Sequence, residues 1–449
     1  MGTFARMKPA APDAVRKTLE ERFPSEGLFQ GKTWRAGPEP FALTSEQVAE
    51  IRRIGAALVR FLEVANGFYY SDDPELAFFR KLLDQGKPDW LLKLHDAEAI
   101  RDQFPVVLRP DLLWTEDGFR ITEIDGVPGG IGMIDFLNLI YGELGFDVIR
   151  GKQLFGDFFV ERDIPFVFSR ESSDYRPETE WMLRHALGQA GARTWLEPEL
   201  SVAEIDRWKG RTVYRFFELW DEELGAAAGR LFELAGEGRL RLTGPPKAFF
   251  EEKLLLALYR DPFLHPRWRR ELGDAHAGVV DRLIPFAWVL DPVPLPPHGV
   301  YPKLEVWDWG ALKAFSQEQR RLVIKVSGFS ANAWGARGVH VGHDLSKAEW
   351  VARLDEALAA FPRNPHILQE FAASARVPNR YFTENGAVQD EPGVVRLSPY
   401  FLVENGAADL RGVLAVVCPP DKKKIHGMTE ATILPCHVAA PNRAQATLI

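Results

Sequence analysis

Two pairs of charged residues stand on either side of a short turn in the first third of the chain. The first pair is Arg109 and Asp111, the second is Glu123 and Asp125, and a turn is expected at residues 116–118. Residues two apart on a strand point to the same face, and a hairpin brings its two strands together. We therefore expect three carboxylates to meet beside one guanidinium group.

Three converging carboxylates indicate a cation site. Asp111, Glu123 and Asp125 would repel one another without a positive charge, and carboxylate oxygens of this kind hold Mg²⁺ beside nucleotide phosphates. The alternative is the exposed polar face of a two-stranded ribbon, on which charged side chains are common. The residue pattern alone leaves both interpretations open.

A lysine stands in the middle of an apolar strand further along the chain. Lys325 lies within Leu322–Val326, where a buried ammonium group needs an anionic partner. The small residues Ser327 and Gly328 begin a loop at 327–339 whose backbone N–H groups can close around phosphate, although it lacks the Gly-Lys-Ser/Thr ending of a Walker A motif. The alternative is an edge-strand lysine that reaches solvent beside a flexible loop.

Other charged residues stand near the ends of expected elements. Lys253 follows Pro245-Pro246 near a helix start, Glu370 ends an apolar run, and Arg396 lies in a strand. A solvated lysine and ordinary ion pairs are the alternatives to a functional role for these residues. The glycine-rich segment 127–132 lacks GxGxxG spacing, so it predicts a tight turn before a helix whose N-terminus can face an anion.

Four successive regions must position these residues, and together they indicate an α+β protein. Residues 1–104 predict a helical lobe with a long amphipathic helix at 44–66, and 105–160 carry the hairpin and a following helix. Strands and helices alternate over 161–243, as is typical of a small parallel α/β domain. Residues 244–449 predict helices, a proline-rich connector, and then strands with one helix.

The composition limits the classes of function. The 55 Lys and Arg against 63 Asp and Glu give a net charge of −8, which argues against a general nucleic-acid binder. Only Cys418 and Cys436 are present, too few for a disulfide framework. The polar N-terminal segment and the absence of a long apolar run predict a cytoplasmic protein that does not bind membranes.

In their order along the chain, these motifs resemble the circularly permuted ATP-grasp family related to glutathionylspermidine synthase, in its synthetase part only. RPD at 109–111 and EID at 123–125 come before the lysine segments, whereas ordinary ATP-grasp enzymes carry the metal ligands last. PPKAFFEEK resembles the first lysine segment of the family and LVIKVSG the second, while ILQEF resembles the hinge that receives adenine. The resemblance runs from about Pro105 to about His437, and Asp125 stands where the synthase has asparagine.

The resemblance implies a circularly permuted ATP-grasp fold with an inserted small α/β domain, resembling a pre-ATP-grasp domain, and a helical N-terminal lobe. It implies ATP and Mg²⁺ as cofactors, with Arg109 stabilising the phosphoryl group in transfer. It places Lys253 and Lys325 on the phosphates. The residues implied to contact the nucleotide are Lys253, Lys325, Ser327, Gly328, Gln369 and Glu370, and those implied to hold Mg²⁺ are Asp111, Glu123 and Asp125.

The activity that the resemblance implies is ATP-dependent joining of a carboxylate to an amine through an acyl-phosphate, with release of ADP and phosphate. Two alternatives stay open: a phosphotransferase that uses the same ATP site, and a nucleotide-binding protein without turnover. The partners expected are a small carboxylate and a small amine. The sequence does not identify either substrate, the general base or the oligomeric state.

Overall fold

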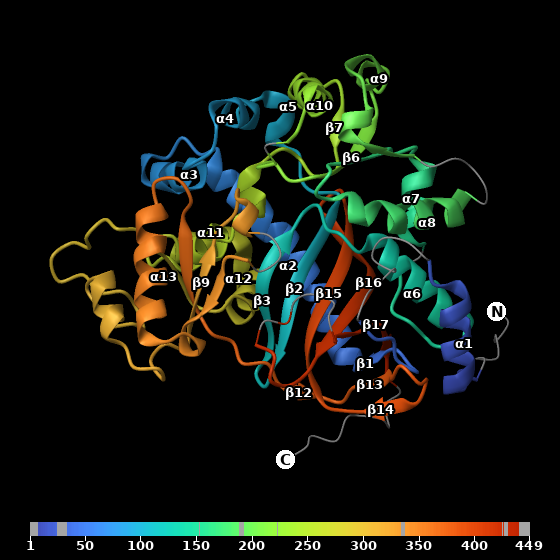
Figure 1. The fold of residues 1–449 in the computed structure, drawn as a ribbon. Coiled ribbons are helices and arrows are strands. Elements are labelled where there is room, and N and C mark those ends of the chain that lie inside the picture. Colours follow the sequence, from blue (N-terminus) through green and yellow to red (C-terminus); the bar gives the residue numbers. More distant parts are fainter. Residues whose placement is uncertain are drawn as a thin grey trace.

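A computed structural model describes residues 8–24, 34–151, 153–187, 193–221, 223–333, 337–423, 425 and 430–439. The chain is a mixed α/β protein in which helices surround three larger sheets and a two-stranded ribbon (Figure 1). No helix in the described ranges is both long and apolar enough to cross a membrane. The first residues of the polar N-terminal segment and part of the loop at 327–339 lie outside these ranges.

The largest sheet contains strands from distant parts of the chain. Its order is β1-β17-β16-β15-β2-β3, and β12 pairs with β15 in addition. The predicted hairpin is confirmed as β2 and β3, but β2 also pairs with β15, so the alternative of an isolated ribbon is wrong. The strands are β1 (Phe41–Leu43), β2 (Val107–Thr115), β3 (Gly118–Asp125), β12 (Arg376–Val377), β15 (Gly393–Glu404), β16 (Ala407–Cys418) and β17 (Thr432–Val438).

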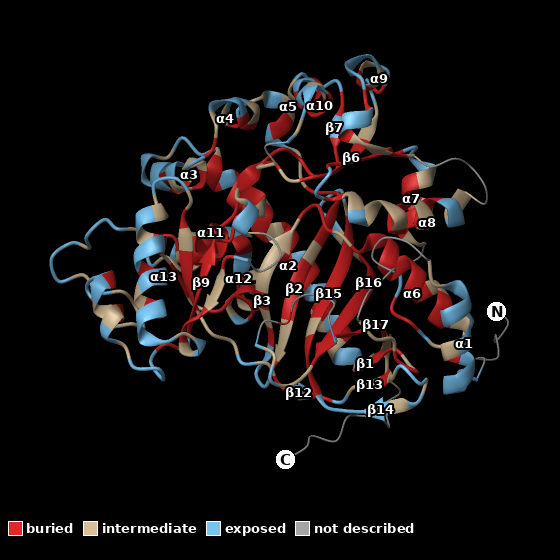
Figure 2. Cartoon of the chain, viewed as in Figure 1, coloured by how far each residue is buried: buried red, intermediate tan, exposed pale blue. Residues whose placement is uncertain are grey.

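Two helices cover opposite faces of this sheet, whose central strands are buried (Figure 2). The predicted helix at 44–66 is confirmed as α2 (Ser45–Tyr69), which begins at Thr44 with a capping box. Phe401 of β15 lies against α2, whereas its neighbour Tyr400 reaches the start of α6 (Ile131–Glu143). Because successive strand residues point to opposite faces, the two helices enclose the sheet between them.

The strand that carries Lys325 lies inside a second sheet, with the antiparallel order β10-β9-β11-β8. β9 (Leu322–Val326) is flanked by β10 and β11, so the alternative of an edge-strand lysine is wrong. Helix α13 (Lys347–Ala360) covers this sheet, and Trp350 is fully buried between them. The other strands are β8 (Ala287–Val289), β10 (Val339–Val341) and β11 (His366–Glu370).

The third sheet is parallel, as the alternation of strands and helices predicted, with the order β5-β4-β6-β7.

The boundaries expected for the four regions at 104, 160 and 243 stay predictions. The strands of this sheet and of the ribbon are β4 (Phe166–Phe168), β5 (Thr194–Leu196), β6 (Thr212–Phe216), β7 (Arg241–Leu242), β13 (Arg380–Phe382) and β14 (Val388–Asp390). The other helices are α1 (Pro12–Arg22), α3 (Ala77–Asp84), α4 (Asp89–His95), α5 (Glu98–Arg101), α7 (Phe155–Glu161), α8 (Arg176–Leu187), α9 (Val202–Asp206), α10 (Ala226–Gly236), α11 (Leu254–Arg260) and α12 (His265–Leu283).

The N-terminus of α6 does not face an external anion, in contrast to the sequence-based expectation. The fully buried carboxylate of Glu178, from α8, accepts hydrogen bonds from the backbone N–H groups of Gly130 (2.8 Å) and Met133 (2.9 Å). Burial raises the pKa of Glu178 to about 7, although both hydrogen bonds lower it. A side chain of the protein itself therefore satisfies the helix end that the segment 127–132 introduces.

Replacing Glu178 with alanine should lower the free energy of unfolding by about 2–4 kcal/mol, because two buried N–H groups lose their acceptor. Urea unfolding of the variant and of unsubstituted protein measures the difference. Glu356→Ala is the matched control, since Glu356 is 61% exposed and should change stability by less than about 0.5 kcal/mol. Equal stability of the two variants would contradict the capping role.

Candidate active site

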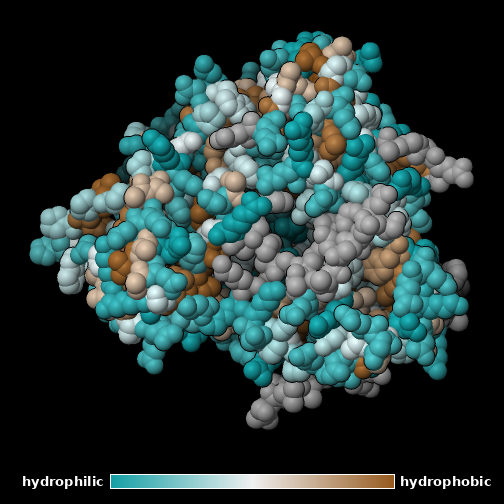
Figure 3. Space-filling view, viewed as in Figure 1, coloured by the Kyte–Doolittle hydropathy of each residue, from teal (hydrophilic) through white to brown (hydrophobic). Residues whose placement is uncertain are grey.

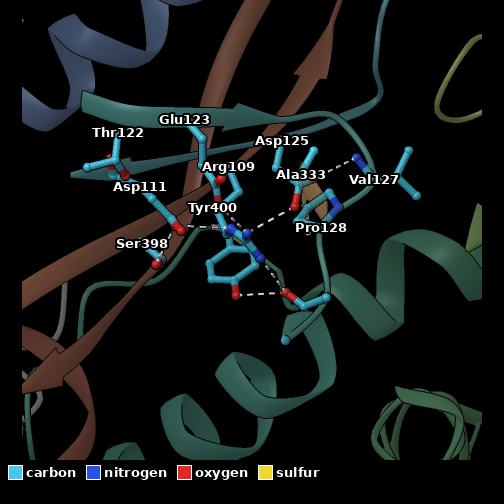
Figure 4. Close-up of polar contacts among 12 residues, drawn as sticks. Arg109, Asp111, Thr122, Glu123, Asp125, Val127, Pro128, Ala333, Ser398 and Tyr400 are labelled. Atoms are coloured by element: carbon cyan, nitrogen blue, oxygen red, sulfur yellow. Dashed lines mark hydrogen bonds and ion pairs between the residues drawn. The ribbon is translucent and has the colours of Figure 1, made fainter. Parts of the chain in front are cut away.

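The four charged residues of the hairpin meet as the sequence predicted (Figure 4). Arg109 is paired across the strands with Asp125, and Asp111 with Glu123. The guanidinium group lies 3.2 Å from Asp111 Oδ1, 2.9 Å from Asp125 Oδ2 and 3.9 Å from Glu123 Oε1. Burial alone would lower the pKa of Arg109, but Asp111 and Asp125 raise it well above its usual value.

Two further cations reach the same carboxylates from other elements. Arg396 of β15 lies 3.0 Å from Asp111 Oδ2, and Lys253 at the start of α11 lies 3.4 Å from Glu123 Oε2. Burial would raise the pKa of Glu123, but Lys253 and then Arg109 hold it at about 2, so Glu123 is ionised at neutral pH. The carboxylates thus face a group of three cations.

Glu123 and Asp111 differ in how well each suits a magnesium ligand. Within the described ranges, no three Asp, Glu, His or Cys side chains form a ready-made metal cluster. Glu123 nevertheless fits a metal ligand, because its two cation contacts exceed 3.3 Å and its side chain is 34% exposed. Asp111 is 1% exposed, and Ser398 and Arg396 already contact its oxygens. The shared magnesium site stays a prediction.

The two lysines are both buried, which contradicts the alternative of a solvated Lys253. Lys253 is 9% exposed and Lys325 is 6% exposed. Lys325 Nζ donates a hydrogen bond to Gln369 Oε1 at 2.7 Å. Burial and the nearby charge of Lys253 lower the pKa of Lys325 to about 8, although Glu123 partly opposes this shift. The ammonium group of Lys325 is therefore in a site that disfavours its charge, with a second lysine nearby.

Two cavities meet at this cluster of charges. The smaller, of about 130 Å³, lies between the hairpin and the sheet of β9, and the larger, of about 460 Å³, lies between the hairpin and the parallel sheet. Glu123, Lys253, Ala333 and Arg396 line both cavities. The face seen in Figure 3 is hollowed near its centre, and the visible floor of the hollow is hydrophilic.

The smaller cavity contains two of the residues predicted to contact a nucleotide. Gln369 and Glu370 of β11 line it together with Lys325 and the apolar side chains of β9 and β10. Gln369 is 3% exposed, and its Nε2 atom is buried without a hydrogen-bond partner among the described residues. A buried donor of this kind is costly unless a ligand supplies an acceptor. Glu370 forms an ion pair with Lys303 at 3.1 Å.

Of the two loop residues expected to contact the nucleotide, only Gly328 lines a cavity. Gly328 lines the larger cavity, but Ser327 lines neither cavity and is fully buried. The Ser327 hydroxyl donates a hydrogen bond to Glu252, and its backbone carbonyl accepts one from the Lys253 N–H at 2.9 Å. Ser327 therefore holds the two lysine segments together beneath the cavities, and its predicted contact with nucleotide stays untested.

The larger cavity has an acidic and aromatic wall that sequence reasoning missed. Glu218, two residues after the end of β6, lines this wall together with Trp220 and Glu251. Burial, with the charges of Glu251 and Asp125, raises the pKa of Glu218 to about 8. No motif marks Glu218; the available signal was its position at the carboxyl end of a parallel strand, where ligands bind in such sheets.

No protein-family model matches the sequence, and the curated proteins include no match. The chain aligns with a glutathione synthetase-like effector from Globodera pallida, solved in its apo form, at a TM-score of 0.56 and 12% identity, over 95% of this chain and 96% of that chain. The two proteins share a fold. A gamma-glutamylcysteine synthetase-like protein from Methylobacillus flagellatus aligns over 90% of this chain and 87% of its own at 12% identity, but its TM-score of 0.34 is too low to support a conclusion.

Replacing Lys325 with methionine should raise the free energy of unfolding by about 1–3 kcal/mol at pH 7, because the native state holds a desolvated cation there. The native pKa of about 8 lies below the usual 10.5, so unsubstituted protein gains stability between those pH values. The advantage of the variant should therefore shrink above pH 8. Urea unfolding at pH 7 and pH 9.5 tests this, with Lys17→Met, at a 75% exposed side chain, as the control; a less stable Lys325 variant at pH 7 would contradict it.

Proposed function

We propose that the protein is an ATP-dependent carboxylate-amine ligase of the circularly permuted ATP-grasp type. The observation that carries this proposal is the junction of two cavities at Glu123, Lys253 and Arg396. One cavity is apolar with cations at its end, which suits a nucleotide, and the other is acidic and aromatic, which suits a further substrate. The fold shared with a synthetase-like effector supports the proposal.

The nucleotide base belongs in the smaller cavity, where the buried Nε2 atom of Gln369 needs an acceptor. A purine ring nitrogen supplies one, and the side chains of Val323, Val339 and Val341 surround an apolar ring. Phosphates that extend from this position reach Lys325 and Lys253. Their negative charge would relieve the repulsion between these two buried lysines.

In the proposed reaction, the hairpin lies beside the phosphoryl group in transfer, on which negative charge develops. Arg109 is held by Asp111 and Asp125, so its guanidinium group is fixed before a substrate arrives. When bound, Mg²⁺ would neutralise phosphate charge, and Glu123, which lines both cavities, is the residue best placed to hold it. Asp125 and Asp111 would supply further ligands by exchanging their contacts with Arg109 and Arg396. The motif order, with this hairpin before both lysine segments, supports the permuted arrangement.

The larger cavity would receive the carboxylate and the amine. The carboxylate attacks the γ-phosphorus of ATP, ADP departs, and the amine nitrogen then attacks the acyl carbon while phosphate leaves. The amine must lose a proton before it reacts. The ionised form of Glu218 can accept this proton, because its side chain lines the cavity and its pKa of about 8 makes it a stronger base than an ordinary carboxylate.

Incubation with Mg-ATP, pooled small carboxylates and amines should give ADP and phosphate, together with a mass gain that corresponds to an amide. Hydroxylamine should capture the acyl-phosphate as a hydroxamate. Nucleotide analysis and mass spectrometry measure these products. AMP as the product would exclude the proposed mechanism, a stable phosphorylated product would indicate a phosphotransferase, and ATP binding without turnover would indicate a silent nucleotide-binding protein.

Substitutions in the two cavities should have separable effects. Lys253→Met and Lys325→Met should each weaken Mg-ATP binding at least tenfold, because each removes a cation from the phosphates. Glu218→Gln keeps the shape of the larger cavity, so it should preserve nucleotide affinity and lower amide formation at least tenfold. Isothermal titration calorimetry and product assays test both effects. Wild-type nucleotide affinity in both lysine variants would remove the phosphate assignment.

A further inference from the structure

Three consecutive residues form ion pairs with three different parts of the chain. Glu251 pairs with Arg215 of the parallel sheet, and Lys253 pairs with Glu123 of the hairpin. Between them, Glu252 pairs with Lys87, in the connection between α3 and α4. The proposed function uses Lys253 directly, but it gives no role to Lys87 or Glu252.

The pair of Lys87 and Glu252 is fully enclosed. Lys87 Nζ lies 2.6 Å from Glu252 Oε1, and each side chain is 1% exposed. The other carboxylate oxygen, Oε2, accepts a hydrogen bond from the Ser327 hydroxyl. A buried ion pair is seldom more stabilising than well-packed apolar side chains of similar volume. Net stability therefore does not explain why charges occupy this position.

The carboxylate of Glu252 orients Ser327, which links the two lysine segments. Because the Ser327 hydroxyl donates to Glu252, its lone pairs remain free to accept the Leu254 N–H at 2.9 Å. The Ser327 carbonyl accepts the Lys253 N–H at 2.9 Å. These two bonds fix the first turn of α11, which carries Lys253, to the end of β9, which carries Lys325.

The surrounding backbone is fitted closely to Glu252 and Lys87. A Cβ atom on Gly328 would lie 2.9 Å from the Glu252 carboxyl carbon. Gly86 has a φ of +77° and lies against the backbone of Arg363 in the turn after α13. Ser327 N–H donates to the Pro365 carbonyl of the same turn at 3.0 Å. The loop of Lys87 therefore contacts Glu252 and the connection between α13 and β11, and Ser327 is bonded to both of these segments.

We propose that Lys87 is a positioning residue for the nucleotide site: it balances the charge of Glu252, whose carboxylate orients Ser327 and thereby sets the separation of Lys253 and Lys325. The inference rests on the proposed function, because it assumes that these lysines bind phosphate. Lys87 itself lines neither cavity and would not touch the nucleotide.

The test separates stability from nucleotide affinity in paired substitutions. Lys87→Met leaves a buried carboxylate unpaired, so it should lower the melting temperature and weaken Mg-ATP binding at least tenfold. Lys87→Met with Glu252→Met replaces both charges by apolar groups and should recover the melting temperature but not the affinity. Lys87→Met with Glu252→Gln keeps an acceptor for Ser327 and should recover both. Calorimetric titration of folded protein gives the affinity, and thermal unfolding gives the stability.

Two controls complete the experiment. Asp135→Asn alters a buried carboxylate that caps α7, away from both cavities, and should lower stability without changing affinity. Ser327→Ala removes the hydroxyl without disturbing a charge, and should weaken binding at least fivefold even if the Lys87 variants fail to fold. Wild-type affinity in Ser327→Ala, or in the doubly apolar variant, would overturn the inference alone. No Mg-ATP binding by unsubstituted protein would overturn the proposed function, and this inference with it.

Discussion

A charge that is removed from water must be matched by an opposite charge or by oriented dipoles, and in this protein that requirement is concentrated at Glu251–Lys253. These three side chains reach the parallel sheet, the α3–α4 connection and the hairpin in turn. None of the three pairs is formed by residues close in sequence. One short segment directly before α11 thus links the parallel sheet, the largest sheet and the α3–α4 connection around the cavities.

This arrangement explains why the cavities lie where they do. The hairpin forms one end of the largest sheet, and β3 has no further strand beyond it in the described sheet order. The polar face of the hairpin therefore borders the space between the other two sheets. Lys253, at the start of α11, and Arg396 of β15 form ion pairs with the carboxylates of this face. The charged junction is neither a surface patch nor part of a core, but the boundary between one apolar and one acidic compartment.

The sequence predicted the elements that carry local signals. The amphipathic helix at 44–66, the alternating pattern of the hairpin and the apolar run around Lys325 were each interpreted correctly as structure. Strict alternation also places Arg109 with Asp111, and Glu123 with Asp125, on one face of each strand. These features depend on neighbours along the chain, so no knowledge of the tertiary fold was needed. The two pairs face each other because the register shifts between Asp111 and Leu112, and no motif marks this bulge.

The remaining features depend on contacts between distant residues. Glu178 accepts a hydrogen bond from the Met133 N–H at the start of α6, although 45 residues separate the two. A single glutamate in a helix gives no sign of such a contact. The sequence pattern around Arg396 does not identify its ion-pair partner, which is Asp111 of the hairpin. Ser327 has the sequence position of a phosphate-binding loop residue. Its buried hydroxyl instead donates to the carboxylate of Glu252, because a charged acceptor forms a stronger hydrogen bond than a neutral one.

The pairing of β1 with β17 has a consequence for the chain as it is synthesised. Phe41 pairs with Cys436, and the apolar side of α2 packs against α12 and β16, which follow it by about 200 and more than 330 residues. Until those later elements emerge from the ribosome, apolar side chains of α2 such as Phe61, which stacks on Trp268 of α12, stay uncovered. Folding of the largest core must wait for contacts of very high sequence separation, which are slow to form. A nascent chain stalled before α12 would expose these side chains, and it would depend on chaperones to avoid aggregation.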